Sequence, residues 1–169
     1  MNFSELERGS VFLDTNILLY AYTVTRFSSS CETLLEKVQT KDITGYINST
    51  VVDEFFHKAL LTQMYMEKRL SPRQAITYIK KHPDVLTNIS TPYVMAKEVL
   101  EQYNLIVLDT SDLLSDTLQI SQQYGLLFSD ALHAASARKH DINYFATNDQ
   151  DFDRVDFLAL VCPSADTTV

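Results

Sequence analysis

Short apolar runs that alternate with helical patterns constrain the fold of this chain most strongly. Four runs cover residues 11–14, 43–47, 105–108 and 144–147, and a fifth, at 157–161, lies near the C-terminal edge. Runs of this length that are rich in Val, Ile, Leu and Phe indicate buried strands. Strands separated by helices are typical of a parallel sheet covered on both faces. We therefore predict a three-layer α/β/α, Rossmann-like domain with a central, mostly parallel sheet of four to five strands.

Capping and turn residues divide the rest of the chain into helices. Ser71-Pro72 and Thr91-Pro92 each place a proline at a first helical position, and Gly125 stops a helix. His82-Pro83 ends another, because the residue before a proline avoids the helical region. The expected helices cover about residues 16–24, 28–40, 50–69, 72–81, 92–103, 111–124 and 129–140.

The length of 169 residues predicts one domain over residues 1–169, with an N-terminal lead at 1–10 and a flexible tail at 163–169. The two cysteines, Cys31 and Cys162, are far apart and are expected to be reduced thiols. No apolar stretch approaches the roughly 20 residues of a membrane span, and the N-terminus lacks the basic region of a signal peptide. The expected location is the cytoplasm.

Four carboxylates lie where predicted strands end or the following helices begin. Asp14 closes the first strand, Glu54 is expected in the first turn after the second strand, Asp130 in the first turn of a helix that Ser129 caps, and Asp149 follows the fourth strand. In open α/β sheets, the crevice beyond the carboxyl ends of the strands is where ligands bind. We therefore expect these four acids to meet at one edge of the sheet.

A cluster of carboxylates favours a bound cation, because like charges in one crevice resist ionisation without one. Oxygen ligands alone select Mg²⁺ or Mn²⁺, and such ions can promote attack of water on a phosphodiester. The sequence contains no Ser-His-Asp triad, GxGxxG motif or P-loop that indicates other chemistry.

Each acid taken alone has a structural interpretation. Asp14 can cap a helix, Glu54 and Asp130 can be favourable first-turn residues, and Asp149 can belong to a turn. Only the joint pattern favours a metal site. Four further side chains are interpreted as structural: Asp109 and Asp112 as cap and first-turn residues, and His57 and His133 as packing or surface residues.

A basic segment interrupts an otherwise acidic chain. The formal net charge is −8, yet residues 57–82 contain six Lys or Arg residues and a single Glu. A solvated pair of helices explains this pattern, and so does a basic clamp for RNA in which Tyr65 and Tyr78 stack on bases. The candidate RNA-binding residues are Lys58, Lys68, Arg69, Arg73, Lys80 and Lys81.

Four phrases of the chain resemble the PIN-domain nucleases, in particular the toxins of VapBC-type toxin–antitoxin pairs. They are Val11-Phe12-Leu13-Asp14-Thr15-Asn16, Val51-Val52-Asp53-Glu54-Phe55, Phe128-Ser129-Asp130-Ala131-Leu132-His133-Ala134-Ala135 and Ala146-Thr147-Asn148-Asp149-Gln150-Asp151-Phe152. They occur in the family's order and span residues 11–152. The middle of the chain, from about Met64 to Tyr103, is expanded relative to a compact toxin of this kind.

The resemblance implies a Mg²⁺- or Mn²⁺-dependent endoribonuclease with a PIN-like fold. It assigns Asp14, Glu54, Asp130 and Asp149 to the catalytic metal site, and it implies that Asn16 and Thr147 orient that site through hydrogen bonds. It also suggests RNA as the substrate, a homodimer, and an antitoxin that blocks the site.

Two other functions remain open at this point. An inactive PIN fold can serve as an RNA- or protein-binding module, although its acid set is complete here. A di-iron carboxylate protein would use Glu54-Phe55-Phe56-His57 as a Glu-x-x-His motif, but that fold requires a helical bundle. An aspartyl-phosphate phosphatase is excluded because residue 16 is Asn where a second Asp is needed.

Overall fold

A computed structural model describes residues 1–165 and contains a five-stranded sheet in the order β3-β2-β1-β4-β5. All neighbouring strands are parallel, which confirms the predicted sheet. The strands are β1 (Gly9–Leu13), β2 (Ile43–Asn48), β3 (Ile106–Leu108), β4 (Tyr144–Ala146) and β5 (Leu160–Val161). The chain runs outward from β1 through β2 to β3 and then crosses to β4 on the other side of β1. The strand order therefore reverses between β1 and β4, the place where α/β sheets bind ligands.

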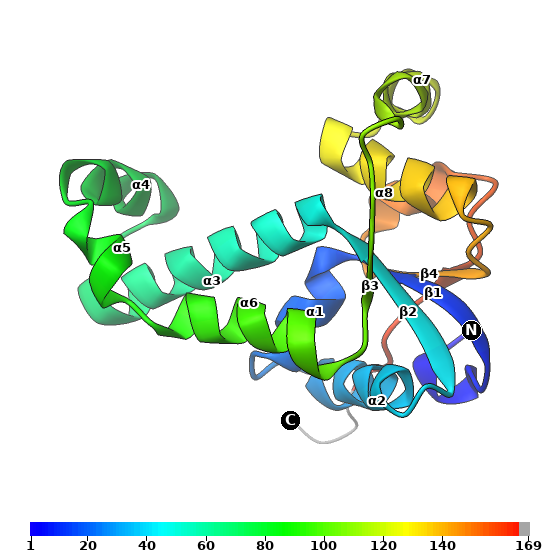
Figure 1. Ribbon diagram of the computed structural model, residues 1–169, viewed down its shortest axis with the longest axis horizontal. Coiled ribbons are helices and arrows are strands. Elements are labelled where there is room, and N and C mark those ends of the chain that lie inside the picture. Colours follow the sequence, from blue (N-terminus) through cyan, green and yellow to red (C-terminus); the bar gives the residue numbers. More distant parts are fainter. Residues whose placement is uncertain (166–169) are drawn as a thin grey trace.

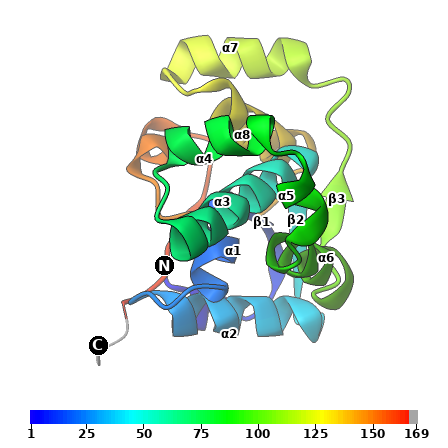
Figure 2. The same ribbon diagram turned by 90° about the vertical axis from the view of Figure 1, so that its left-hand side faces the viewer.

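Helices cover both faces of the sheet (Figures 1 and 2). Helices α1, α2 and α6 lie on one side, whereas α7 and α8 lie on the other. The helices are α1 (Thr15–Ala21), α2 (Ser28–Gln39), α3 (Ser49–Lys68), α4 (Pro72–Lys81), α5 (Asp84–Asn88), α6 (Thr91–Gln102), α7 (Leu114–Tyr124) and α8 (Phe128–Lys139), with 3-10 turns η1 (Phe3–Glu5) and η2 (Gln150–Arg154).

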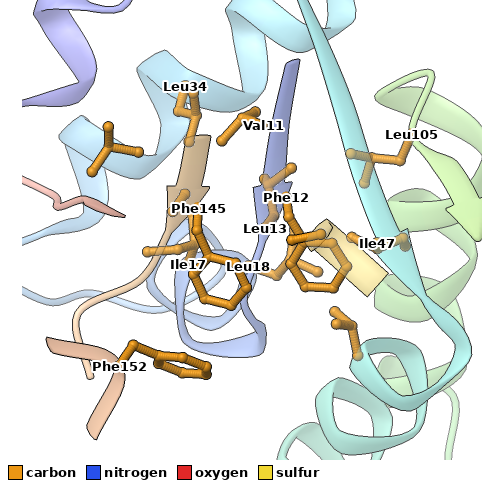
Figure 3. Close-up of a cluster of buried hydrophobic side chains, with 14 of the residues drawn as sticks. Val11, Phe12, Leu13, Ile17, Leu18, Leu34, Ile47, Leu105, Phe145 and Phe152 are labelled. Carbon is orange, nitrogen blue, oxygen red and sulfur yellow. The ribbon is translucent and has the colours of Figure 1, made fainter. Parts of the chain in front are cut away.

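The main core surrounds strands β1 and β4 (Figure 3). Phe12 of β1 and Phe145 of β4 stack with their ring centroids 5.3 Å apart. Phe152 of η2 extends this aromatic row, because its ring centroid lies 4.6 Å from that of Phe145. All three rings are buried, so η2 is held against the end of β4 at the point where the strand order reverses.

A second, smaller core holds a module at the far end of α3. We define this α4–α5 module as residues 70–89. It packs on α3 through a cluster separate from the main core, formed by Leu60, Met64, Ala75, Ile79 and Ile89. Figure 1 shows α4 and α5 at the end of α3 that lies away from the sheet. Of the expansion predicted from about Met64 to Tyr103, residues 70–89 thus form an appendage on α3, whereas α6 packs on the main core through Val99.

Several boundaries differ from the prediction. Strand β1 begins at Gly9, inside the expected lead, and the residues before it are packed, because Phe3 and Leu6 are buried and Lys37 Nζ donates to both of their carbonyl oxygens. Helix α5 was not predicted, because His82-Pro83 signals only an ending. Helix α7 begins at Leu114, three residues later than expected.

The C-terminal tail predicted at 163–169 lies partly beyond the described residues, since 166–169 are outside them. Within residues 1–165, no helix combines the length and the apolar character that a membrane span requires.

Candidate active site

Asp14 follows β1 directly and is buried beneath the start of α1. It occupies the N-cap position of α1, but its side chain makes no capping hydrogen bond. Its Oδ2 atom instead accepts hydrogen bonds of 2.6 Å from Asn16 Nδ2 and of 2.6 Å from Thr147 Oγ1. The capping interpretation of Asp14 is therefore wrong, and its carboxylate belongs to a network that joins the ends of β1 and β4. Burial raises the pKa of Asp14, although the hydrogen bond from Thr147 opposes this shift.

The segment after β4 is tied to the same network. Thr147 Oγ1 accepts a 3.0 Å hydrogen bond from the backbone N–H of Asp149, and Asn16 Oδ1 accepts one of 3.3 Å from the backbone N–H of Asn148. The predicted contacts of Asn16 and Thr147 are thus present. Asp149 is the N-cap of η2 and accepts a 2.9 Å hydrogen bond from the Asp151 N–H, so its turn role is also real.

Glu54 enters the site from α3. It is the sixth residue of the helix and therefore lies in the second turn. The prediction of a first-turn position is wrong. Its Oε2 atom accepts a 2.7 Å hydrogen bond from Thr15 Oγ1 and lies 3.6 Å from His133 Nε2, beyond hydrogen-bonding distance. Burial alone would raise the pKa of Glu54, but His133 and Thr15 outweigh burial and hold it at about 2.

His133 is the buried link between Glu54 and β2. Asn48, at the end of β2, uses Oδ1 to cap α3 through the N–H of Val51, so its amide nitrogen Nδ2 is the group that faces His133. That nitrogen lies 3.2 Å from His133 Nδ1 and donates to Ser136 Oγ at 3.0 Å. Because an amide nitrogen only donates, Nδ1 is assigned as the acceptor of this contact, and Nε2 faces Glu54. His133 is completely buried, which agrees with the packing role predicted for it.

Asp130 lies in the first turn of α8, as predicted, and is partly buried. No side chain or backbone group within residues 1–165 donates a hydrogen bond to its carboxylate. Burial and the nearby charges of Asp14, Glu54 and Asp149 together raise its pKa to about 6, against an opposing effect of His133. Asp130 is therefore close enough to the other three predicted acids for their negative charges to disfavour its ionisation.

The carboxylates of the four acids are not arranged around one common point in this structure. Among the described residues, no three His, Cys, Asp or Glu side chains lie close enough to hold a metal ion in this arrangement. Glu54 is engaged by Thr15, and Asp149 by the backbone of η2. The donor chemistry nevertheless fits Mg²⁺ or Mn²⁺, because the set is all carboxylate and its members repel one another without a cation.

The other polar residues considered from the sequence lie outside this site. Asp109 accepts a hydrogen bond from the Ser111 N–H, and Asp112 pairs with Lys139, so both are structural. The predicted cap and first-turn positions are wrong, because α7 begins at Leu114 and both acids precede its N-cap. His57 is exposed. All six candidate RNA-binding residues lie on α3, on α4 or between them, namely Lys58, Lys68, Arg69, Arg73, Lys80 and Lys81.

Three residues that contact the acids or support them were missed. Thr15 and Asn48 each adjoin the end of a strand, and Ser136 lies one turn beyond His133. A polar residue next to a strand end was the available signal for Thr15 and Asn48, whereas nothing local in the sequence distinguishes Ser136.

Comparison with known proteins identifies the family. The sequence profile of the PIN domain matches residues 11–158, which include every strand except the first two residues of β1 and the whole of β5. The chain belongs to the PIN-domain family. This PIN domain is 29% identical over 160 residues to Ribonuclease VapC2 of Methanocaldococcus jannaschii, covering 93% of this chain and 96% of that protein.

Solved structures support the same fold. VapBC2 from Rickettsia felis, bound to a promoter DNA fragment, superposes with a TM-score of 0.57 at 22% identity, covering 92% of this chain and 99% of that one. VapC20 of Mycobacterium tuberculosis, described as a toxin that cleaves the sarcin–ricin loop, gives 0.55 at 16% identity, covering 88% and 96%. The parallel sheet excludes the helical bundle that the di-iron alternative requires.

Proposed function

We propose that this PIN domain is an endoribonuclease that hydrolyses RNA phosphodiester bonds with the help of Mg²⁺ or Mn²⁺. The observation that carries the proposal is the hydrogen-bond network through Thr147 that joins Asp14 to the backbone of Asp149 where the strand order reverses. Glu54 and Asp130 lie near enough to add to the repulsion among these carboxylates. The full-length similarity to Ribonuclease VapC2 supports RNA as the substrate.

The residues of the site fall into those that would hold the metal and those that position the carboxylates. Asp14, Glu54, Asp130 and Asp149 would hold the metal. When bound, the metal supplies positive charge that stabilises phosphoryl oxygens and activates water for attack. Asn16 and Thr147 fix Asp14 Oδ2, and Thr15 fixes Glu54. Asp130 has the freest carboxylate of the set, so it can reorient toward metal or substrate.

A cleavage assay tests this proposal. A panel of RNAs of mixed sequence is incubated with the protein in Mg²⁺, Mn²⁺ or EDTA, and the products are separated on a denaturing gel. We expect cleavage with either metal, none in EDTA, and none by Asp14→Asn. Binding of RNA without cleavage in Mn²⁺ would instead identify the protein as a non-catalytic PIN module.

We also propose that an antitoxin protein binds this domain in the cytoplasm, as in a VapBC-type pair. A groove of about 340 Å³ between α1, α3 and α6 offers it an apolar surface that includes Leu19, Met66 and Met95. Tyr22 and Gln63 line the groove too, and within the described residues Tyr22 Oη and Gln63 Oε1 have no hydrogen-bond partner. Co-expression with a candidate antitoxin, followed by co-purification, tests the pair, and Met66→Glu should abolish the complex.

A further inference from the structure

The face of α3 that carries Glu54 continues away from the active site as a row of side chains. Lys58, Leu61 and Tyr65 follow Glu54 at intervals of four, three and four residues, which keeps them on one side of the helix. At a rise of 1.5 Å per residue, Tyr65 lies about 16 Å along the axis from Glu54. A polymer bound along this row would therefore lead into the acidic site.

The cations at the end of this row are free of acidic partners. Within residues 1–165, none of the six Lys and Arg residues of the segment 57–82 forms an ion pair, whereas four of the other eight, Lys97, Arg138, Lys139 and Arg154, each pair with a carboxylate. Unpaired cations are available to phosphate groups.

Aromatic rings are interleaved with these cations. The Tyr65 ring is 53% exposed, and the Arg69 guanidinium carbon lies 5.4 Å from its centroid. Lys68 Nζ lies 5.2 Å from the centroid of Tyr78 on α4. Tyr78 also borders a shallow depression of about 370 Å³ together with Arg73 and Lys81. Alternating rings and cations are typical of surfaces that bind single-stranded nucleic acid, where bases stack and phosphates pair with charges.

The arrangement of the helices places this surface on the same side of α3 as α8, which carries Asp130. Figures 1 and 2 both show α4 and α8 on the same side of α3, with α4 over its far end and α8 at the end near the sheet. Asp130 lies on α8 and Glu54 on the nearby part of α3, so the row that begins at Glu54 runs from the acids toward α4. Lys80 follows Tyr78 by two residues and projects from a different flank of α4.

We propose that this surface is a binding track for single-stranded RNA that guides the substrate into the acidic site. The α3–α4 track comprises Lys58, Tyr65, Lys68, Arg69, Arg73 and Tyr78. The inference rests on the proposed ribonuclease function and adds where and in what form the substrate binds. Only unpaired bases can stack on the exposed Tyr65 ring, so the track selects single-stranded RNA over a duplex.

Binding is measured by fluorescence anisotropy with a labelled, unstructured single-stranded RNA, in the Asp14→Asn background so that the probe stays intact. We expect Tyr65→Ala to raise Kd on the order of tenfold, the loss of one stacked base. Tyr65→Phe keeps the ring and should bind like its parent. Arg69→Asn should also weaken binding while preserving the fold, because Arg69 ends α3 with a positive φ of 57° that Asn tolerates.

Two comparisons make the outcome specific. Arg8→Gln removes an exposed cation just before β1, at the opposite end of that strand from Asp14, and should leave Kd unchanged. A duplex RNA of the same sequence should bind Tyr65→Ala and its parent equally. Unchanged binding of the single strand by Tyr65→Ala and Arg69→Asn, or an equal loss for the duplex, would overturn the track.

Failure of the track and failure of the proposed function give different results. If the wild type cleaves RNA through Asp14 while the track variants bind RNA like their parent, the track is wrong and the ribonuclease assignment stands. If the track variants lose RNA binding but the wild type cleaves nothing in Mg²⁺ or Mn²⁺, the track stands and the catalytic assignment is wrong.

Discussion

Thr147 Oγ1 donates a 2.6 Å hydrogen bond to Asp14 Oδ2 and at the same time accepts one of 3.0 Å from the backbone N–H of Asp149. A single hydroxyl thus joins the acid that follows β1 to the acid that follows β4. It spans the point where the strand order reverses, and it sets the position of one acid relative to the other. The geometry of the acidic site therefore depends on a residue that carries no charge.

Replacing this hydroxyl tests its role. Thr147→Val removes the donor to buried Asp14 and the acceptor for the Asp149 N–H while conserving shape. We expect the free energy of unfolding to fall by about 1–3 kcal/mol, the cost of buried polar groups left unpaired, together with a loss of RNA cleavage. Urea unfolding measures the first effect. Thr147→Ser retains the hydroxyl and should stay near the wild type, and equal stability of the Val and Ser variants would contradict the account.

Stability should depend on pH through Asp130. Its pKa in the folded protein, about 6, lies above its ordinary value of 3.8, so ionisation above pH 6 opposes folding. Asp14 is shifted in the same direction. Glu54, with a pKa lowered from 4.5 to about 2, stabilises the fold above pH 4.5 and loses this effect only below it. The melting temperature in EDTA should therefore rise between pH 7 and pH 5, and Asp130→Asn should flatten that rise.

Metal binding should oppose the fall in melting temperature that is expected in EDTA as the pH rises from 5 to 7. A cation among the carboxylates removes their repulsion, and a ligand that binds only the folded state raises its stability. We expect Mg²⁺ or Mn²⁺ to raise the melting temperature at pH 7.5 and to do so much less at pH 5.5, where Asp130 is largely protonated. Differential scanning fluorimetry measures both shifts. The same shift in Asp14→Asn as in the wild type would show that the metal binds elsewhere.

The exposed leucines of α7 predict how two copies would meet. Leu114 and Leu118 lie one turn apart, and Leu118 is 61% exposed. We propose that two copies pack these two leucines against each other in a homodimer, because exposed apolar surface often marks a protein–protein contact. Light scattering coupled to size exclusion should give twice the chain mass of 19.3 kDa for the wild type and the single mass for Leu118→Glu. A monomeric wild type would refute the dimer and leave the catalytic proposal untouched.

The sheet was predictable because each buried strand is a short apolar run between helical patterns, and a strand buried on both faces needs such a run. Asp14, Asp130 and Asp149 were placed correctly relative to the strands and helices for the same reason. Glu54 was placed in the first turn of α3 but lies in its second, because the cap is Asn48, the last residue of β2, one or two residues before the predicted Ser49 or Thr50.

Other features depend on contacts that a single sequence does not display. The hydrogen bonds of Asn48 to His133 and Ser136 join residues more than eighty positions apart. The sequence predicted helix α4 and the positive charge around it, but the separate core of the α4–α5 module and its place at the end of α3 arise from tertiary packing. Helix α5 is only five residues long, too short for a periodic pattern to reveal.

The most direct test of the central claim is the single-turnover rate of RNA cleavage in Mn²⁺ for Asp14→Asn, Glu54→Gln, Asp130→Asn and Asp149→Asn, each beside Asp109→Asn. Asp109 is an exposed acid that follows β3 and accepts a hydrogen bond from the Ser111 N–H, so it is a matched acid outside the site. The account predicts that each of the four variants loses at least about 100-fold in rate, since each removes part of the metal and water activation, and that Asp109→Asn cleaves like the wild type. Full activity in Asp14→Asn, or an equal loss in Asp109→Asn, would contradict it.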